Sequence, residues 1–291
     1  MSAHPSQKEK AETLRRLHHG PRLLVLLNAW DVISARLVED LGHPAVATSS
    51  AGIANCLGYP DSQRISRSEM LEMVQRIVQA VRVPVTADLE SGYAGSPQEM
   101  GETAQQLLET GAVGLNLEDS QQNETRLVDL GLAVEKIEAV REAGTAAGVR
   151  LVINARTDAY WWKGAEPGTR MAETVRRAQA FRLAGADCIF IPGLKDAAEI
   201  ATFLRESPGP LNILGGAGVP PLPELQKLGV ARVSLGSGPA RAAVGVIRKI
   251  ARELTETGTY TSITEGAVPY PEANRLLENL TTKDTKEHKE D

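Results

Sequence analysis

Eight short apolar runs, most of them rich in β-branched residues, recur along the chain with longer amphipathic stretches between them. None exceeds nine residues, a length that suits a buried strand better than a helix. They span residues 23–27, 45–50, 83–90, 113–119, 150–158, 188–193, 211–216 and 232–238. Eight alternating strand and helix units over about 240 residues predict an α/β fold, specifically a (β/α)₈ barrel of the TIM type.

The stretches between these runs carry helical periodicity and recognisable start and stop signals. Ser66 and Ser96-Pro97 stand where an N-cap is expected, and glycine separates helix from strand in TGAV, AGAD and LGVA. The predicted helices cover residues 66–81, 96–110, 132–147, 169–184, 196–206, 223–228 and 239–257. The alternative is a doubly wound open sheet, but no G-x-G-x-x-G follows the first strand.

The chain divides into one large domain and two terminal additions. We expect residues 1–257 to form the barrel, with a leading helix within residues 1–20. Residues 258–280 form a C-terminal extension that contains Pro269, Pro271 and a short helix. Residues 281–291 are entirely polar and predict a disordered tail.

Composition excludes several classes of function. Aromatic residues are only 4% of the chain, so Val, Leu, Ile and Ala must fill the core. A net charge of −5 argues against binding nucleic acid through a broad basic face. No apolar run approaches 18 residues and the polar start lacks a signal-peptide pattern, so we expect a cytoplasmic protein with no membrane span.

The two cysteines do not form a recognisable redox or zinc motif. Cys188 opens the sixth run and is expected to be a buried, apolar-like residue. Cys56 is expected in the loop after the second strand, where packing is a better explanation than nucleophilic chemistry.

Three carboxylates lie at the ends of neighbouring predicted strands: Asp88, Glu90 and Glu118. Catalytic groups of barrels gather at these ends, and residues two apart on a strand face the same way. Closely spaced carboxylates need a counter-charge, and oxygen ligands without His or Cys favour Mg²⁺ or Mn²⁺. The alternative is that these acids pair with arginine or cap helices.

Two further features can bind an anion. Arg156 ends a strongly apolar strand, and its guanidinium can hold a carboxylate through two parallel hydrogen bonds. Its alternative role is to pair with one of the acids. Ser49, Ser50 and Ala51 offer hydroxyl and backbone N–H groups at a strand end, although a plain serine-rich loop explains them nearly as well.

Some chemistries lack the residues they need. None of the five histidines falls at a predicted strand end, which argues against a Ser-His-Asp triad and a His-ligated zinc. No lysine lies within a predicted strand, which argues against a Schiff-base aldolase. Lys195, just after the sixth strand, is the remaining candidate for such chemistry.

Several segments together resemble the isocitrate lyase/phosphoenolpyruvate mutase superfamily over roughly residues 10–255. They are NAWDVISARLVEDLG, ATSSAGIANCLGYPD, PVTADLESGYAG, GLNLEDS, VINARTDAY and ADCIFIPG. The resemblance implies a (β/α)₈ barrel that binds Mg²⁺ and the carboxylate and oxo oxygens of a 2-oxo acid. The cation then stabilises an enolate-like state.

The resemblance also implies roles for individual residues. Asp88 matches the direct metal ligand, Glu90 an acid that often reaches the metal through water, and Glu118 the third acid. The remaining matches are Asp61 near the metal-bound waters, Arg156 as the substrate-binding arginine, Ser49, Ser50 and Ala51 at the substrate-carboxylate turn, Trp30 at an aromatic wall, and Asn212 on the seventh strand.

One segment departs from the superfamily. Isocitrate and methylisocitrate lyases follow the Glu-Asp pair with a gating loop that bears K-[KR]-C-G-H, whereas residues 118–126 read EDSQQNETR. This loop has no Cys, Lys or His, and the Lys-bearing loop of the mutases is missing too. The proton donor is therefore not assigned, although Glu124 and Arg126 are possible contributors from the loop.

The residues and the resemblance together predict a Mg²⁺-dependent lyase. Its substrate is expected to be a small 2-oxo or 2-hydroxy di- or tricarboxylate, cleaved at a C–C bond by retro-aldol reaction or decarboxylation. The alternatives are a phosphate-binding isomerase or synthase that uses loops 215–218 and 236–238, and a non-catalytic oxo-acid binder. The resemblance further implies a homodimer or homotetramer in which a C-terminal helix packs on a neighbouring subunit.

Overall fold

A computed structural model describes residues 5–120, 126–162 and 168–278. Its nine strands form one sheet of parallel neighbours in the order β1-β9-β8-β7-β6-β5-β4-β3-β2. The strands are β1 (Leu24–Leu26), β2 (Asn28–Ala29), β3 (Val46–Thr48), β4 (Val85–Asp88), β5 (Gly114–Glu118), β6 (Val152–Arg156), β7 (Cys188–Phe190), β8 (Leu211–Leu214) and β9 (Arg232–Ser234).

The sheet curves into a nearly closed barrel because its first and last strands meet. The first predicted run, residues 23–27, contains β1, which pairs with β9, and the residues just after it form β2, which pairs with β3. Asn28 joins the two ends, since its side-chain carbonyl accepts hydrogen bonds from the Leu235 and Gly236 N–H groups at 2.8 and 2.9 Å. The TIM-type barrel prediction is confirmed, and the open doubly wound alternative is excluded.

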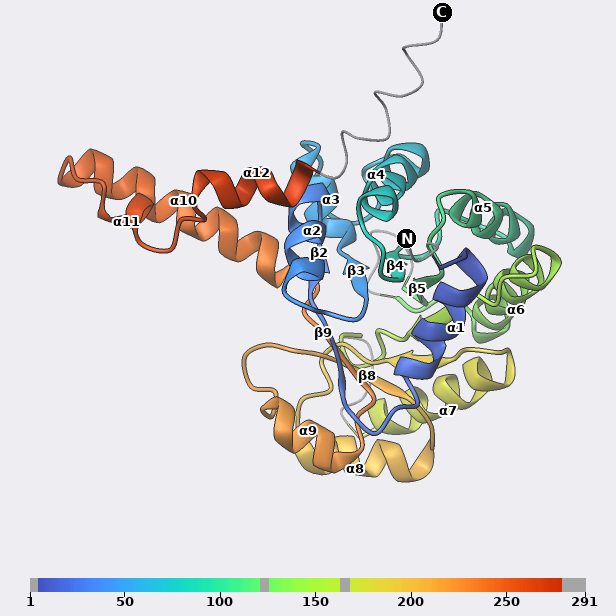
Figure 1. Ribbon diagram of the computed structural model, residues 1–291. Coiled ribbons are helices and arrows are strands. Elements are labelled where there is room, and N and C mark those ends of the chain that lie inside the picture. Colours follow the sequence, from blue (N-terminus) through green and yellow to red (C-terminus); the bar gives the residue numbers. More distant parts are fainter. Residues whose placement is uncertain (1–4, 121–125, 163–167, 279–291) are drawn as a thin grey trace, which may run out of the picture.

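Helices surround the barrel, as Figure 1 shows. They are α1 (Gln7–Leu17), α2 (Val32–Asp40), α3 (Ser50–Cys56), α4 (Arg67–Ala80), α5 (Pro97–Glu109), α6 (Leu130–Ala146), α7 (Arg170–Leu183), α8 (Ala197–Glu206), α9 (Leu222–Leu228), α10 (Gly238–Glu256), α11 (Thr261–Thr264) and α12 (Tyr270–Glu278). The predicted caps are confirmed: Ser66 and Ser96 each accept a hydrogen bond from the N–H of the glutamate three residues on, in capping boxes.

The segment after the second predicted strand differs from the prediction. The run 45–50 does not stay extended to its end, because β3 stops at Thr48 and Ser49 caps a short helix, α3. Cys56 is therefore the exposed last residue of that helix and not part of a loop. Cys188 is buried at the start of β7, as predicted.

Aliphatic side chains fill most of the core. Among the buried apolar residues of the described chain, Phe181, Phe190 and Phe203 are the aromatic ones, which agrees with the predicted Val, Leu, Ile and Ala packing. Polar side chains are buried as well, and the largest of them is Arg232 on β9, which is fully buried. Its Nη2 lies 3.3 Å from Asn116 Oδ1 and its Nη1 lies 3.5 Å from His18 Nε2.

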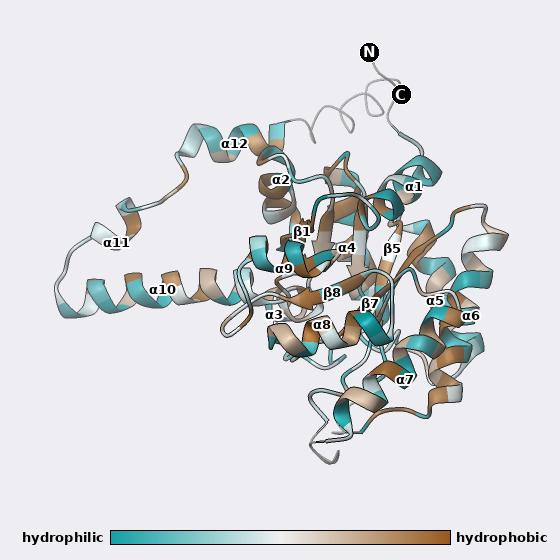
Figure 2. Ribbon diagram, turned by 90° about the horizontal axis from the view of Figure 1, so that it is seen from below, coloured by the Kyte–Doolittle hydropathy of each residue, from teal (hydrophilic) through white to brown (hydrophobic). Residues whose placement is uncertain are grey.

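The C-terminal helices form an arm beside the barrel. In Figures 1 and 2, α10 extends away from the barrel, and the chain returns through α11 to α12 beside α2. Arg275 on α12 pairs there with Asp40 at 2.9 Å. No residue of α10 is buried, and its apolar side chains include Ile247, which is 65% exposed.

Helices are present near both ends of the chain. The leading helix is present as α1, and the short helix of the C-terminal extension is α12. The predicted tail, residues 281–291, lies outside the described residues. Among the residues that are described, no helix combines the length and apolar composition that a membrane span requires.

Candidate active site

A cavity of about 690 Å³ opens at the carboxyl ends of the barrel strands. The loops after the strands line it, as expected for a catalytic barrel. Of the residues selected from the sequence, the cavity brings together Ser49, Ser50, Ala51, Asp61, Asp88, Glu90, Glu118 and Arg156.

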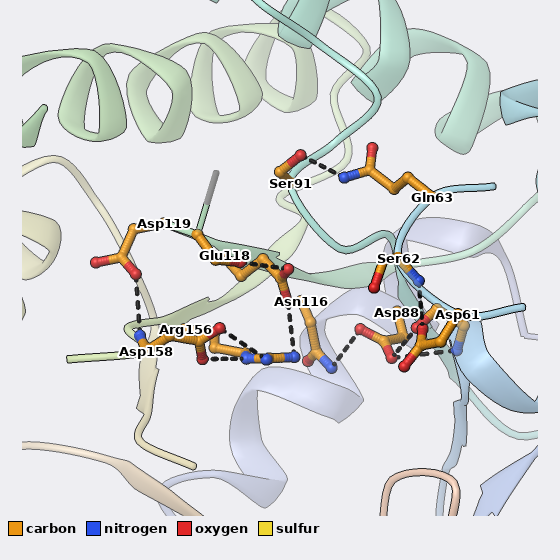
Figure 3. A network of polar contacts seen from close by, with 12 residues as sticks. Asp61, Ser62, Gln63, Asp88, Ser91, Asn116, Glu118, Asp119, Arg156 and Asp158 are labelled. Atoms are coloured by element: carbon orange, nitrogen blue, oxygen red, sulfur yellow. Dashed lines mark hydrogen bonds and ion pairs between the residues drawn. The ribbon is translucent and has the colours of Figure 1, made fainter. Parts of the chain in front are cut away.

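Asp88 ends β4 and is held from both sides. Its Oδ2 accepts hydrogen bonds from the Ser50 hydroxyl at 2.8 Å and the Ser50 N–H at 3.1 Å. Its Oδ1 accepts one from Asn116 Nδ2 at 3.2 Å, and Figure 3 shows Asn116 between Asp88 and Arg156. These contacts fix the orientation of the carboxylate and leave lone pairs for a further ligand.

Glu90 lines the cavity as predicted, but the backbone conformation that places it there differs from the prediction. The strand stops at Asp88, and Glu90 adopts a left-handed backbone with φ of 53°, so the alternation of a strand does not place it. Its carboxylate nevertheless lines the same cavity as Asp88. Burial, followed by the charges of Asp88, Glu118 and Asp61, raises the pKa of Glu90 to about 8.

Glu118 and Arg156 form a partly buried ion pair on neighbouring strands. Arg156 Nη1 lies 2.6 Å from Glu118 Oε2, while Asp158 accepts from the same guanidinium at 2.7 and 2.8 Å. The rings of Trp161 and Phe190 lie 5.2 and 5.8 Å from the guanidinium carbon. The alternative role considered for Arg156, pairing with one of the acids, is therefore present. A substrate that binds Arg156 must share its guanidinium with Glu118 and Asp158.

These contacts also affect protonation. Burial raises the pKa of Glu118 above its ordinary value, although Arg156 and the Ser120 hydroxyl, 2.6 Å away, stabilise its charged form. Burial opposes the charge of Arg156, but Glu118 and Asp158 outweigh that effect and raise its pKa.

The remaining predicted residues divide into two groups. The Ser49 hydroxyl accepts from Gly52 N at 3.2 Å, so Ser49 and Ser50 are engaged in holding α3 and Asp88. Asp61 lines the cavity and accepts from Ser62 N at 2.8 Å. Trp30 and Asn212 are not among the cavity-lining residues, and Asn212 instead donates to the Ser234 hydroxyl at 3.0 Å.

The loop after β5 is only partly described. Glu124, one possible contributor, lies outside the described residues. Arg126 borders a separate cavity of about 810 Å³ together with Trp162 and Arg176.

The oxygen ligands in the cavity match the needs of a divalent cation. Glu90 Oε1 is buried and has no hydrogen-bond partner among the described residues, in a cavity that also holds Asp61, Asp88 and Glu118. This excess of negative charge fits a hard cation. Within the described chain, no three His, Cys, Asp or Glu side chains gather closely enough to hold a metal alone. The arrangement suits Mg²⁺, which commonly keeps several waters and uses only one or two carboxylates.

Several cavity residues were not selected from the sequence. Asn28, Asn116 and Asp158 were visible as polar residues at strand ends, but nothing in the sequence distinguished them from structural residues. Gln63 and Trp161 come from loops whose approach to the barrel depends on the tertiary fold. Arg241 is a further lining residue of this kind, whereas Lys195, which also lines the cavity, was singled out in the sequence.

The nearly closed barrel and the acid-rich cavity at the carboxyl ends of its strands place this chain in the class of barrel enzymes. The sequence model described as phosphoenolpyruvate phosphomutase matches residues 14–255, and this chain belongs to that family. The superfamily resemblance found in the sequence is thereby confirmed.

Individual relatives support the same placement. An oxaloacetate decarboxylase of Bradyrhizobium diazoefficiens is 33% identical over 217 residues, 72% of each chain. A crystal structure of a Burkholderia cenocepacia J2315 protein is similar with a TM-score of 0.86 and 37% identity, covering 92% of this chain and 95% of that one. A phosphonopyruvate hydrolase crystallised with oxalate and Mg²⁺ has a TM-score of 0.82 and 26% identity, covering 96% and 99%.

Proposed function

We propose that the chain is a Mg²⁺-dependent carbon–carbon lyase acting on a small 2-oxo or 2-hydroxy di- or tricarboxylate, with Mn²⁺ as an alternative cation. The observation that carries this proposal is the buried Oε1 of Glu90, which has no hydrogen-bond partner among the described residues and shares its cavity with Asp61, Asp88, Glu118 and Asp158. Asp88, Glu90 and Glu118 would hold the cation, Asp88 directly and the others through water, with Asp61 beside the coordinated waters. When bound, the cation supplies the positive charge that stabilises an enolate oxygen.

Decarboxylation is the reaction that the residues favour. In a 2-oxo acid with a carboxylate on C4, the C3–C4 bond breaks, CO₂ leaves, and the electron pair moves into the C2 carbonyl as an enolate. A proton then returns to C3. This cleavage needs no base, whereas retro-aldol cleavage must first remove a hydroxyl proton. Loop 120–126 contains no Cys, Lys or His to exchange that proton, and the 33% identical relative is an oxaloacetate decarboxylase.

The residues of the chain would bind and orient the substrate. Arg156 would hold a substrate carboxylate with its remaining N–H groups, while Glu118 and Asp158 keep the guanidinium in place. Ser49, Ser50 and Ala51 would form the neighbouring wall that contacts the substrate carboxylate, since all three line the cavity. Trp30 and Asn212 would not contact the substrate and would act indirectly, through the packing of α3 and β8.

The test uses EDTA-treated protein titrated calorimetrically with Mg²⁺ in the presence of oxalate, an enolate mimic. We expect tight binding that requires both ligands, and loss of Mg²⁺ binding in Asp88→Ala with an unchanged circular dichroism spectrum. Unaltered Mg²⁺ affinity in Asp88→Ala would refute the cation site. A panel of oxo and hydroxy acids then separates CO₂ release from aldol-type products, and binding without turnover identifies a non-catalytic binder.

A second candidate is a ligand that carries phosphate or phosphonate. Loops 215–217 and 236–238 line the same cavity, with Lys195 and Arg241 beside them, as expected where a barrel binds phosphate. Competition by inorganic phosphate against Mg²⁺ and oxalate would favour this candidate. Indifference to phosphate would favour the carboxylate.

The exposed arm supports a proposal about assembly. The apolar side chains of α10 lie outside the barrel, and none of its residues is buried. We propose that this arm, with the extension 258–280, packs on a second copy of the chain in a homodimer or homotetramer.

A further inference from the structure

The segment that carries Glu90 has an unusual backbone. Glu90 and Tyr93 both have φ of 53°, and Gly92 between them has φ of 87°. Residues with a Cβ disfavour this left-handed region, so the conformation persists only where surrounding contacts hold it. The position of the Glu90 carboxylate depends on those contacts.

Gln63 holds the segment from the cavity side. Its Nε2 donates to the Ser91 hydroxyl, and its Oε1 accepts from Tyr93 N at 3.0 Å. The Glu90 carboxylate also accepts a hydrogen bond from the Gln63 backbone. Figure 3 shows the Gln63 side chain reaching toward Ser91 from the loop that bears Asp61. One residue thus joins the two acid-bearing loops.

Lys136 holds the same segment from the opposite side. It lies on α6 and is only 5% exposed. Its Nζ donates to the carbonyl of Ala94 at 2.7 Å and lies 3.5 Å from that of Ser91. Burial lowers the pKa of Lys136 and the Glu99 charge opposes that effect, but no carboxylate forms a direct ion pair with Lys136 within the described parts of the chain, and burying an unpaired ammonium is unfavourable.

The residues around Lys136 show what an ammonium contributes at this position. It borders a cavity of about 10 Å³ together with Glu118 and Arg156. The hydrogen bonds of the ammonium hold the backbone that follows Glu90, and the carboxylate whose charge favours the ammonium is Glu99. A neutral side chain of similar length would fill the same space but provide neither the charge nor the donors.

We propose that Lys136 and Gln63 are positioning residues that hold the 90–94 segment so that the Glu90 carboxylate faces the cation. This inference rests on the proposed function in assigning Glu90 to the cation site. Neither side chain is assigned a role in the chemistry itself.

The first experiment measures Mg²⁺ affinity calorimetrically in the presence of oxalate, for Lys136→Met and Gln63→Leu. Residues that orient metal ligands typically change affinity by 10- to 100-fold, so we expect binding at least about tenfold weaker. Lys227→Met removes an exposed lysine on α9 and should match the wild type. Lys136→Arg keeps the cation and should recover affinity relative to Lys136→Met. Wild-type affinity in both Lys136→Met and Gln63→Leu overturns the proposal.

The second experiment works without metal and separates this inference from the proposed function. Hydrogen exchange of the amides in residues 90–95 should be at least about tenfold faster in Lys136→Met and Gln63→Leu, because lost contacts permit local opening. Exchange in α9 is the internal control. If wild-type protein binds no Mg²⁺, the proposed function fails, but faster exchange still supports the holding role. Unchanged exchange refutes that role whatever the metal result.

Discussion

Acidification should weaken the fold through His18, which is only 3% exposed. Its Nδ1 lies 2.8 Å from the Leu14 carbonyl, so Nε2 carries the lone pair that faces Arg232 Nη1. Burial and the nearby Arg232 charge lower the pKa of His18 from 6.5 to about 4. A proton added to the folded state would place two cations together inside the barrel.

The sign and size of the effect follow from linkage. Well above pH 6.5, His18 is neutral in both the folded and the unfolded state and contributes no pH dependence. As the pH falls from 6.5 toward 4, the unfolded chain binds the proton first, so the free energy of unfolding decreases. The full loss is about 3 kcal/mol for a pKa that falls from 6.5 to about 4. The slope near pH 5 is about 1.2 kcal/mol per pH unit.

Urea unfolding at several pH values between 7 and 4, at fixed protein concentration, measures this slope. His18→Gln removes the titrating group, and subtracting its curve from the wild-type curve cancels the other carboxylates and histidines. The wild type should lose about 3 kcal/mol more than His18→Gln over this range. His19→Gln changes an exposed neighbour and should keep the wild-type slope. Parallel wild-type and His18→Gln curves would show that the buried His18–Arg232 contact does not disfavour the proton.

Three further substitutions test packing, charge and assembly. Gly92→Ala should lower the free energy of unfolding by about 2 kcal/mol, because its φ is 87° and a Cβ would lie 2.3 Å from Met100 Sδ; urea unfolding measures this. Arg177→Met leaves the buried Asp119 carboxylate without its 3.1 Å partner and should cost about 3 kcal/mol in the same assay. Ile247→Glu on α10 should reduce the solution mass by light scattering, and an unchanged mass would contradict assembly through the arm.

The barrel was predictable because its signals are local. A parallel strand buried on both faces must be short and continuously apolar, and the eight runs satisfy that requirement. Helices α4 and α5 begin at serine caps that the sequence displays directly. The short helices α2 and α3 were not predicted, since seven to nine residues directly after a strand carry too little periodicity.

The site was predictable only in part. Polar residues at strand ends identified Asp88, Glu118 and Arg156, because the carboxyl ends of all strands meet on one face. Glu90 was selected through strand alternation, although a left-handed turn places it. Lys136 could not be found in this way, because its role depends on α6 packing against a loop more than 40 residues away in sequence.

The meeting of β1 and β9 has a consequence for how the chain reaches its native state during synthesis. The hydrogen bond from Gly236 to Asn28 joins residues 208 positions apart, so the ring cannot be completed until nearly the whole barrel has left the ribosome. Until then, the edges of β1 and β8 that later pair with β9 remain open, and such edges invite pairing with other chains. Closure also carries the entropic cost of a very long loop. The open edges of β1 and β8 are therefore covered only after β9 has been translated, and until then the nascent chain can aggregate through them.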